Sequence, residues 1–181
     1  IEGENIDFII RNAEGDMTVA ASIADYFVSL KPDLIQAITT PSAQTVVAAA
    51  EGTDIPIIFS SVTDPVAAKL VPSWQETGPN VTGVTDWFDM EPQVEFVLKV
   101  LPNIKVLGTA YNPGETNAVV QVEYLRRIAP DYGLTIVEKT AATTADVYAA
   151  GMSLVGQCEA VWIPTCNTVG GVGIESMIQV G

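Results

Sequence analysis

The sequence of 181 residues contains no histidine. Histidine is the commonest general base near neutral pH and the commonest zinc ligand, so this absence disfavours many hydrolases and zinc sites. The chain also lacks the GxxxxGK, GxGxxG and GxSxG patterns that bind phosphates, bind dinucleotides or present a nucleophilic serine. The sequence therefore predicts no catalytic centre of these kinds, no cofactor and no metal site.

Basic residues are few: 8 Lys and Arg stand against 22 Asp and Glu, for a net charge of −14. Nucleic-acid binding depends on clustered Lys and Arg, and this chain has no such cluster, so we expect no nucleic-acid partner. No apolar run reaches the roughly 18 residues that suggest a membrane-spanning helix. The chain begins at IEGEN without an initiator Met and ends at IQVG within a helical pattern. We therefore expect an internal piece of a longer protein, whose absent signal says nothing about location.

Cysteines are also few, namely Cys158 and Cys166. The residues between them read as a strand, which would separate the two Cα atoms by roughly 26 Å. Because a disulfide requires a Cα separation of about 4.4–6.8 Å, we expect no bridge between them.

What the sequence does contain is a regular alternation of apolar strand patterns and amphipathic helix patterns, with 48% hydrophobic residues. This alternation predicts an α/β fold with parallel sheets covered on both faces. The expected strands are residues 5–10, 33–39, 56–61, 80–85, 104–111, 134–140 and 159–164. The expected helices are residues 16–30, 41–50, 65–70, 90–101, 116–129, 143–155 and a weak one from about 168. The rhythm breaks at residues 74–88, so we expect one lobe over residues 1–80 and a second over 81–181.

The junctions where strands pass into helices are rich in polar groups, at residues 38–44, 60–66, 110–117 and 164–169. Thr40 and Asp64 each precede a proline, a pattern typical of a helix N-cap. Thr143-x-x-Asp146 resembles a capping box, on a loop of a different kind. One interpretation is that these groups only satisfy the free N–H groups of helix starts.

The other interpretation is a ligand site, because loops at the carboxyl ends of parallel strands share one edge of a sheet, where ligands bind. Helix N-termini there attract a carboxylate, while Asp64 and Glu115 would hold an ammonium group. Such an edge suits a zwitterion such as an amino acid. The side chains expected to line it are Thr40, Ser42, Thr63, Asp64, Asn112, Glu115, Asn117, Thr165 and Asn167.

The stretches TPSAQ (40–44), SVTDPV (61–66), NVTGV (80–84) and YNPGE (111–115) together resemble a known family. It is the family of ABC-transporter substrate-binding proteins with a type I periplasmic-binding fold, some of which bind tryptophan and other aromatic amino acids. The resemblance runs along nearly the whole chain in family order. It implies two α/β lobes with a ligand in the cleft between them, incomplete here at both ends, with roughly 100 further residues completing both lobes.

By this resemblance, Ala43 and Gln44 join the first helix start, and Cys166 joins the last junction. Two positions depart from the family: Cys166 stands where Asp is common, and Ala118 where Ser is common. Cys166 would be either a small neutral wall of the pocket or simply buried. Among the aromatic residues, Tyr111 is the best candidate to stack on a ligand; Trp74, Trp87 and Phe88 either do so or pack the lobe surface, and Trp162 is expected in the core.

The resemblance implies an extracytoplasmic solute-binding protein, periplasmic or lipid-anchored, that presents an amino acid to an ABC permease. Two alternatives stay open. One is the ligand-sensing domain of a transcriptional regulator, and the other is a hydrolase in which Asp64 and Glu115 form an acid/base pair. A piece that lacks one end of each lobe would also expose apolar sheet edges and self-associate.

Overall fold

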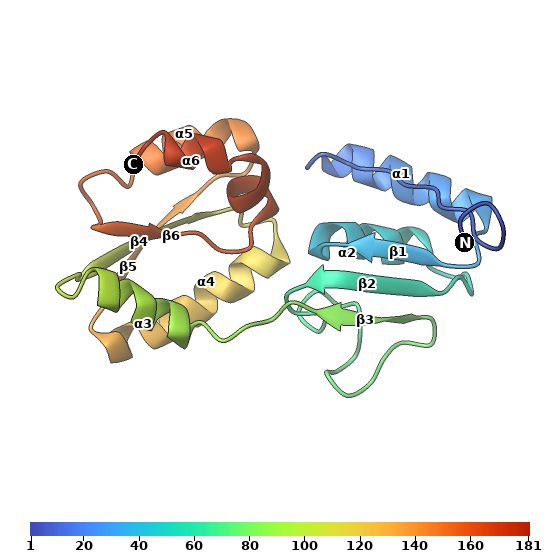
Figure 1. Cartoon of the computed structure of the whole chain (residues 1–181), viewed down its shortest axis with the longest axis horizontal. Helices are drawn as coiled ribbons and strands as arrows, with labels where there is room; N and C mark the ends of the chain where they lie inside the picture. The colour runs from blue at the N-terminus through green and yellow to red at the C-terminus, as the bar shows by residue number, and fades with distance from the viewer.

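The computed structural model describes all residues, 1–181, and contains two three-stranded parallel sheets. The sheets lie at opposite ends of the long axis, joined by one connecting stretch after β3 (Figure 1). The strands are β1 (Ile35–Ile38), β2 (Ile57–Val62), β3 (Val81–Thr85), β4 (Val106–Tyr111), β5 (Thr135–Thr140) and β6 (Ala160–Trp162). The α-helices are α1 (Met17–Leu30), α2 (Thr40–Ala49), α3 (Glu91–Val100), α4 (Thr116–Ile128), α5 (Val147–Met152) and α6 (Ile174–Ile178). Shorter helical turns are η1 (Ala129–Tyr132), η2 (Thr144–Asp146) and the π-helix η3 (Asn167–Val172).

The first sheet has the order β1-β2-β3 and carries α1 and α2 on one face. Ile57, Phe59 and, after an irregularity in the strand, Val62 of β2 point into this core and are almost fully buried. On the opposite face Ile38, Ile58 and Val84 remain exposed. A parallel sheet normally has both faces covered. This face of the first sheet is instead bare in the chain.

The second sheet has the order β5-β4-β6, with β4 in the centre. One core cluster joins Leu107 of β4 to α3 and α4, and another joins Ala110 of β4 to α5, α6 and η3. Both faces of this sheet are therefore covered by helices, as Figure 1 shows. The predicted α/β class with parallel sheets is confirmed.

Most expected elements form within a few residues of their predicted bounds, and the capping box of Thr143 and Asp146 is confirmed. The strand predicted at 5–10 is wrong: this segment has no sheet partner, and Phe8 and Ile10 are exposed. β1 pairs only with β2, and an apolar segment without a hydrogen-bonded neighbour does not become a strand.

Two further predictions need correction. The helix expected at 65–70 is only a series of turns, because Lys69 adopts a left-handed φ of 59° that interrupts helical geometry. The strand expected at 159–164 is limited to Ala160–Trp162. Pro164 lacks the N–H group that a longer ladder would require.

The change of sheet also differs from the expected division at residue 80. β3 pairs with β2 in the first sheet, and Val81 belongs to the first core cluster, whereas Met90 belongs to the second. We therefore propose the boundary between lobes within residues 86–89. No helix combines the length and the apolar character needed to cross a membrane.

Candidate functional site

The strand-to-helix junctions of the two sheets meet where the two halves of the molecule touch. Gln44 of α2 donates from Nε2 to Thr116 Oγ1 of α4 at 3.3 Å. Thr63, at the end of β2, lies with its Oγ1 3.2 Å from the Oγ1 of Thr165, which follows β6. The structure thus brings all four polar junctions of the sequence into one region between the sheets.

Glu115 is the most heavily bonded side chain of this region. Its carboxylate accepts from the backbone N–H of Asn167 at 2.6 Å and of Thr168 at 2.8 Å, and from both their side chains at 2.9 and 2.6 Å. Asn117 Nδ2 at 3.4 Å and the thiol of Cys166 at 3.5 Å complete the set. A carboxylate has about four lone-pair positions, so Glu115 is saturated by the chain itself.

Burial would by itself raise the pKa of Glu115, but the hydrogen bonds from Thr168 and Asn167 outweigh it and lower the pKa. The carboxylate is therefore ionised at neutral pH and caps the start of η3. Its own helix, α4, begins without any side-chain cap, although Glu115 occupies the N-cap position. The amide groups of the first turn of α4 are thus left to partners from outside the helix.

Asn112 and Cys166 fasten the same two loops together. Asn112 Nδ2 donates to the carbonyl of Ala142 and to Thr168 Oγ1, while its Oδ1 accepts from the N–H of Gly114. Cys166 Sγ accepts from the N–H groups of Asn112 and Val169 at 3.3 and 3.4 Å. Burial raises the pKa of this thiol, so Cys166 is a neutral, buried N-cap.

Asn117 and Gln121, one turn apart on α4, both hold the backbone of Thr165. Asn117 Nδ2 donates to its carbonyl, and Gln121 Oε1 accepts from its N–H at 2.7 Å. The sequence reasoning missed Gln121 because it lies beyond the junction, inside the helix. Its spacing of four residues from Asn117 places both side chains on one face and was the available signal.

The start of α2 differs from the prediction. The N-cap is Thr39, with a φ of 81°, and it makes no side-chain cap; its Oγ1 donates to Ser42 Oγ at 3.3 Å. Thr40 is already helical and buried, and its Oγ1 has no partner. Ala43 is fully buried in the first core. Thr40 is therefore not the cap that its place before Pro41 suggested.

Asp64 does cap backbone groups, although those of a turn rather than of a regular helix. Its Oδ1 accepts from the N–H of Val66 and of Ala67, both at 2.9 Å. Both bonds fall on Oδ1, so Oδ2 is left without a bond of this kind. Asp64 is only partly buried and follows Thr63, which contacts the other lobe.

All the candidate aromatic residues except Trp74 have partners within the chain. Tyr111 donates from its hydroxyl to Glu138 at 3.3 Å, and burial raises its pKa. Trp87 packs edge to face on Tyr124, with ring centroids 5.5 Å apart. Phe88 packs against the core, and Trp162 is buried there and donates to Gln93, which confirms its predicted core position. Trp74 is about half exposed.

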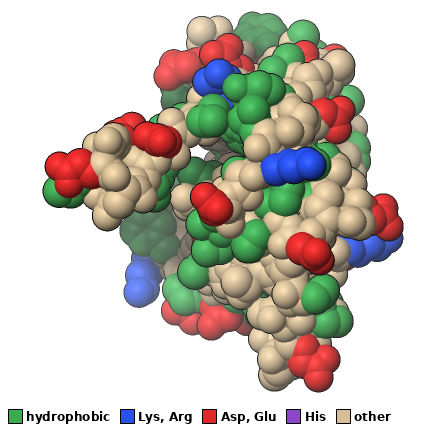
Figure 2. Space-filling view, turned by 90° about the vertical axis from the view of Figure 1, so that its right-hand side faces the viewer, with side chains coloured by type: hydrophobic (Ala, Val, Ile, Leu, Met, Phe, Trp, Pro, Cys, Tyr) green, Lys and Arg blue, Asp and Glu red, His purple; other side chains and the backbone are tan.

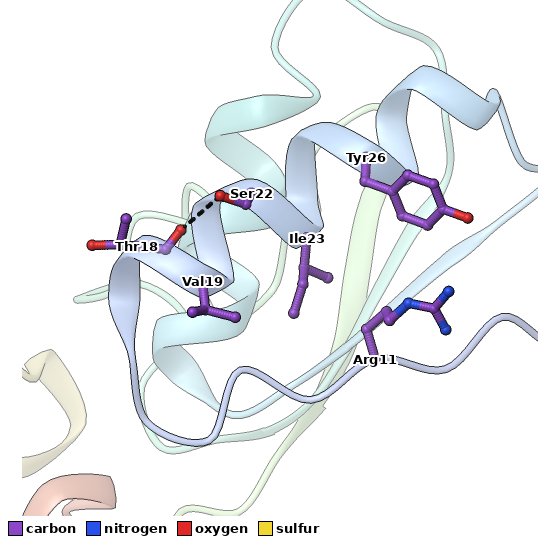
Figure 3. Close-up of a pocket in the computed structure, with 6 residues that line it drawn as sticks. All are labelled: Arg11, Thr18, Val19, Ser22, Ile23 and Tyr26. Atoms are coloured by element: carbon purple, nitrogen blue, oxygen red, sulfur yellow. Dashed lines mark hydrogen bonds between the residues drawn. The ribbon is translucent and has the colours of Figure 1, made fainter.

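A hollow of the surface lies elsewhere, along α1. It measures about 430 Å³, and Val19, Ile23 and Tyr26 face Arg11 of the N-terminal segment across it (Figure 3). The guanidinium of Arg11 lies 5.6 Å from the ring centroid of Tyr26. None of the junction residues lines this hollow. No three His, Cys, Asp or Glu side chains are grouped to hold a metal ion.

Comparison with known proteins decides the family. The whole chain, residues 1–181, matches the family described as ABC transporter substrate binding protein. The chain belongs to this family. It is 42% identical over 168 residues to a tyrosine-binding protein of Clostridioides difficile, covering 93% of this chain and 48% of that protein. The chain thus spans about half the length of this curated relative.

Solved structures agree with the assignment. A conserved domain protein from Vibrio cholerae superposes with a TM-score of 0.94 at 41% identity, over 99% of this chain and 60% of that one. An ABC domain from Streptococcus pneumonia in complex with L-Trp gives a TM-score of 0.92 at 30% identity, over 97% and 60% of the two chains. These neighbours confirm the periplasmic-binding-protein fold.

A third structure resembles this chain in sequence but superposes on it less well. A ligand-free, open substrate-binding protein from Clostridium difficile is 39% identical, over 99% of this chain and 60% of that one, yet its TM-score is only 0.61. The L-Trp complex is less similar in sequence but superposes far better. The two sheets of this chain are therefore arranged as in the L-Trp complex rather than as in the open structure.

Proposed function

We propose that this chain is the ligand-binding part of an extracytoplasmic solute-binding protein that captures an aromatic amino acid between its two lobes. The observation that carries the proposal is the meeting of the junctions of both sheets, linked by Gln44–Thr116 and Thr63–Thr165. The name of the tyrosine-binding relative and the L-Trp in the similar structure support an aromatic amino acid as ligand. An ABC permease is the partner that membership of the family implies.

The charged ends of the amino acid are matched by different groups. The first turns of α2 and α4 both begin without a side-chain cap, and α2 and α4 face each other through Gln44 and Thr116. Their free N–H groups and positive dipole ends suit the ligand carboxylate. For the ammonium group we propose Asp64 rather than Glu115, since the oxygens of Glu115 are occupied and Oδ2 of Asp64 is not.

The remaining site residues take supporting roles in this proposal. Ser42, Ala43 and Gln44 shape the first helix start, and Thr63, Thr165 and Asn167 shape the contact between lobes. Asn112, Cys166 and Glu115 hold the loops of the second lobe. Tyr111 forms part of the wall of that lobe and contacts Glu138.

A hydrolase is disfavoured by the same geometry. An acid/base pair needs two carboxylates free to exchange protons with a substrate. Glu115 instead accepts hydrogen bonds on both oxygens from η3 and has a lowered pKa. We therefore propose binding without chemistry, in a periplasmic or lipid-anchored protein, and we place the regulator alternative second because the matched family is one of transporters.

The test is isothermal titration of the full-length protein with tryptophan, tyrosine and phenylalanine, with alanine and lysine as comparison ligands. We expect saturable binding of at least one aromatic amino acid, and a loss of affinity of about tenfold or more in Asp64→Asn, which leaves the Oδ1 cap in place. The exposed carboxylate of Glu123 provides the control variant Glu123→Gln. Absence of binding to every amino acid would overturn the proposed ligand class.

A further inference from the structure

Thr165 is held at three points, two of them from α4. Asn117 donates to its carbonyl, Gln121 accepts from its N–H at 2.7 Å, and its own Oγ1 lies 3.2 Å from Oγ1 of Thr63 in the other lobe. The backbone of a loop residue is thus fixed by two side chains of one helix. These bonds fix the orientation of both side-chain amides, since the Asn117 amide must turn its NH₂ group to the carbonyl and the Gln121 amide must turn its oxygen to the N–H.

This arrangement leaves two buried polar atoms unpaired. The second polar atoms of the two amides, Asn117 Oδ1 and Gln121 Nε2, are buried and have no hydrogen-bond partner. Asn117 is 3% exposed and Gln121 is fully buried. Unpaired buried polar atoms cost free energy, and apolar side chains of similar shape would avoid that cost only by leaving the N–H and carbonyl of Thr165 without these partners. The two amides therefore fix the backbone of Thr165 at the cost of two unpaired buried atoms.

We propose that Asn117 and Gln121 are positioning residues that hold Thr165 against Thr63 and thereby favour the closed arrangement of the lobes. Thr165 lies in the loop between β6 and η3, where a free backbone would sample several conformations. Fixing its N–H and carbonyl removes that freedom before the lobes meet, so its hydroxyl is already placed for contact with the first lobe. Gln121 thus acts on closure through Thr165, to which its hydrogen bond is made.

A contact that exists only between closed lobes stabilises that state and shifts the population toward it. The proposal therefore goes beyond the identity of the ligand and can be tested without one. Its failure would leave the amino-acid proposal standing, and the reverse also holds.

The experiment uses full-length protein in which two exposed sites, one in each lobe, carry Glu51→Cys and Glu123→Cys, and in which Cys158→Ser removes the accessible native thiol. It measures the distance between spin labels on the two introduced cysteines. We compare wild type with Gln121→Met, which preserves volume and removes the amide. The matched control is Gln157→Met, at an exposed glutamine. We expect at least a threefold fall in the ratio of closed to open molecules for Gln121→Met, measured where both proteins are fully folded because loss of the acceptor of the Thr165 N–H also lowers stability, and no change for the control.

A second pair of variants separates positioning from a general structural effect. Thr63→Val removes the contact in the first lobe while leaving Gln121 and Thr165 intact, and it should lower the closed population by a similar factor. Adding Gln121→Met to Thr63→Val should then change nothing further, because both act through one contact. Independent, additive effects, or an unchanged closed population in Thr63→Val, would overturn the proposal even if Gln121→Met did not fold.

Discussion

Glu115 accepts hydrogen bonds from both the backbone N–H and the side-chain amide of Asn167, at 2.6 and 2.9 Å. The residue at the N-cap of α4 thus caps η3 instead of its own helix. One carboxylate ties together the loops that follow β4 and β6, and it leaves the start of α4 open toward the other lobe. The organisation of the candidate site depends on this relationship.

Replacement of Glu115 by alanine should therefore destabilise the protein. Removal of the carboxylate leaves the N–H groups of Asn167 and Thr168 without an acceptor. Hydrogen bonds to charged groups contribute about 1.5–3 kcal/mol each, and they are not additive, so we expect a loss of about 2–4 kcal/mol in the free energy of unfolding. Urea denaturation measures it, and Glu123→Ala, at an exposed position, should stay within about 0.5 kcal/mol of wild type. Equal effects of the two variants would contradict this role.

The same carboxylate predicts an acid dependence of stability. The pKa of Glu115 is lower in the folded protein than its ordinary value of 4.5. Its contribution is therefore fully present above that value and is lost as the pH falls below it, through the folded-state pKa. The difference in unfolding free energy between wild type and Glu115→Gln should shrink between pH 5 and pH 3. A difference that is constant over this range would show that the charge of Glu115 does not contribute.

The two cysteines should differ sharply in reactivity. Cys166 is 1% exposed and has a raised pKa from burial, whereas Cys158 is only partly buried, although burial raises its pKa as well. Because the thiolate is the reacting species, a thiol reagent should label Cys158 first and Cys166 only on unfolding. Mass spectrometry after timed labelling distinguishes the two, with Cys158→Ser as control. Labelling of Cys166 in the native state at the rate of Cys158 would show that the loop after β6 opens readily.

The chain of 181 residues, expressed by itself, should self-associate. Ile38, Ile58 and Val84 are exposed on the bare face of the first sheet. Phe8 and Ile10, in the segment that precedes α1, are also exposed. Figure 2 shows hydrophobic side chains in patches on the surface at the end of the molecule that carries the first sheet. Exposed apolar surface of this kind favours association. Sedimentation velocity should show concentration-dependent oligomers that Ile58→Thr and Val84→Thr together reduce; a strict monomer at all concentrations would contradict it.

The alternation of apolar patterns predicted the α/β class and most helices and strands. Amphipathic segments such as 116–129 need only their own periodicity to become helices against a sheet. The predictions were wrong where the secondary structure of a segment depends on its surroundings and not on its own periodicity. Residues 5–10 have a strand pattern but pair with no strand of either sheet, and residues 65–70 have a helix pattern that the left-handed Lys69 interrupts.

Sequence by itself determined that polar groups would gather at the ends of parallel strands, because chain direction and connectivity fix that edge. Only the tertiary structure decided what each polar group does there. It directed Glu115 to η3, placed Thr40 inside α2 rather than at its cap, and added Gln121 from within α4. Hydrogen-bond partners far apart in the sequence are selected by packing in three dimensions, and residue type at a junction does not specify them.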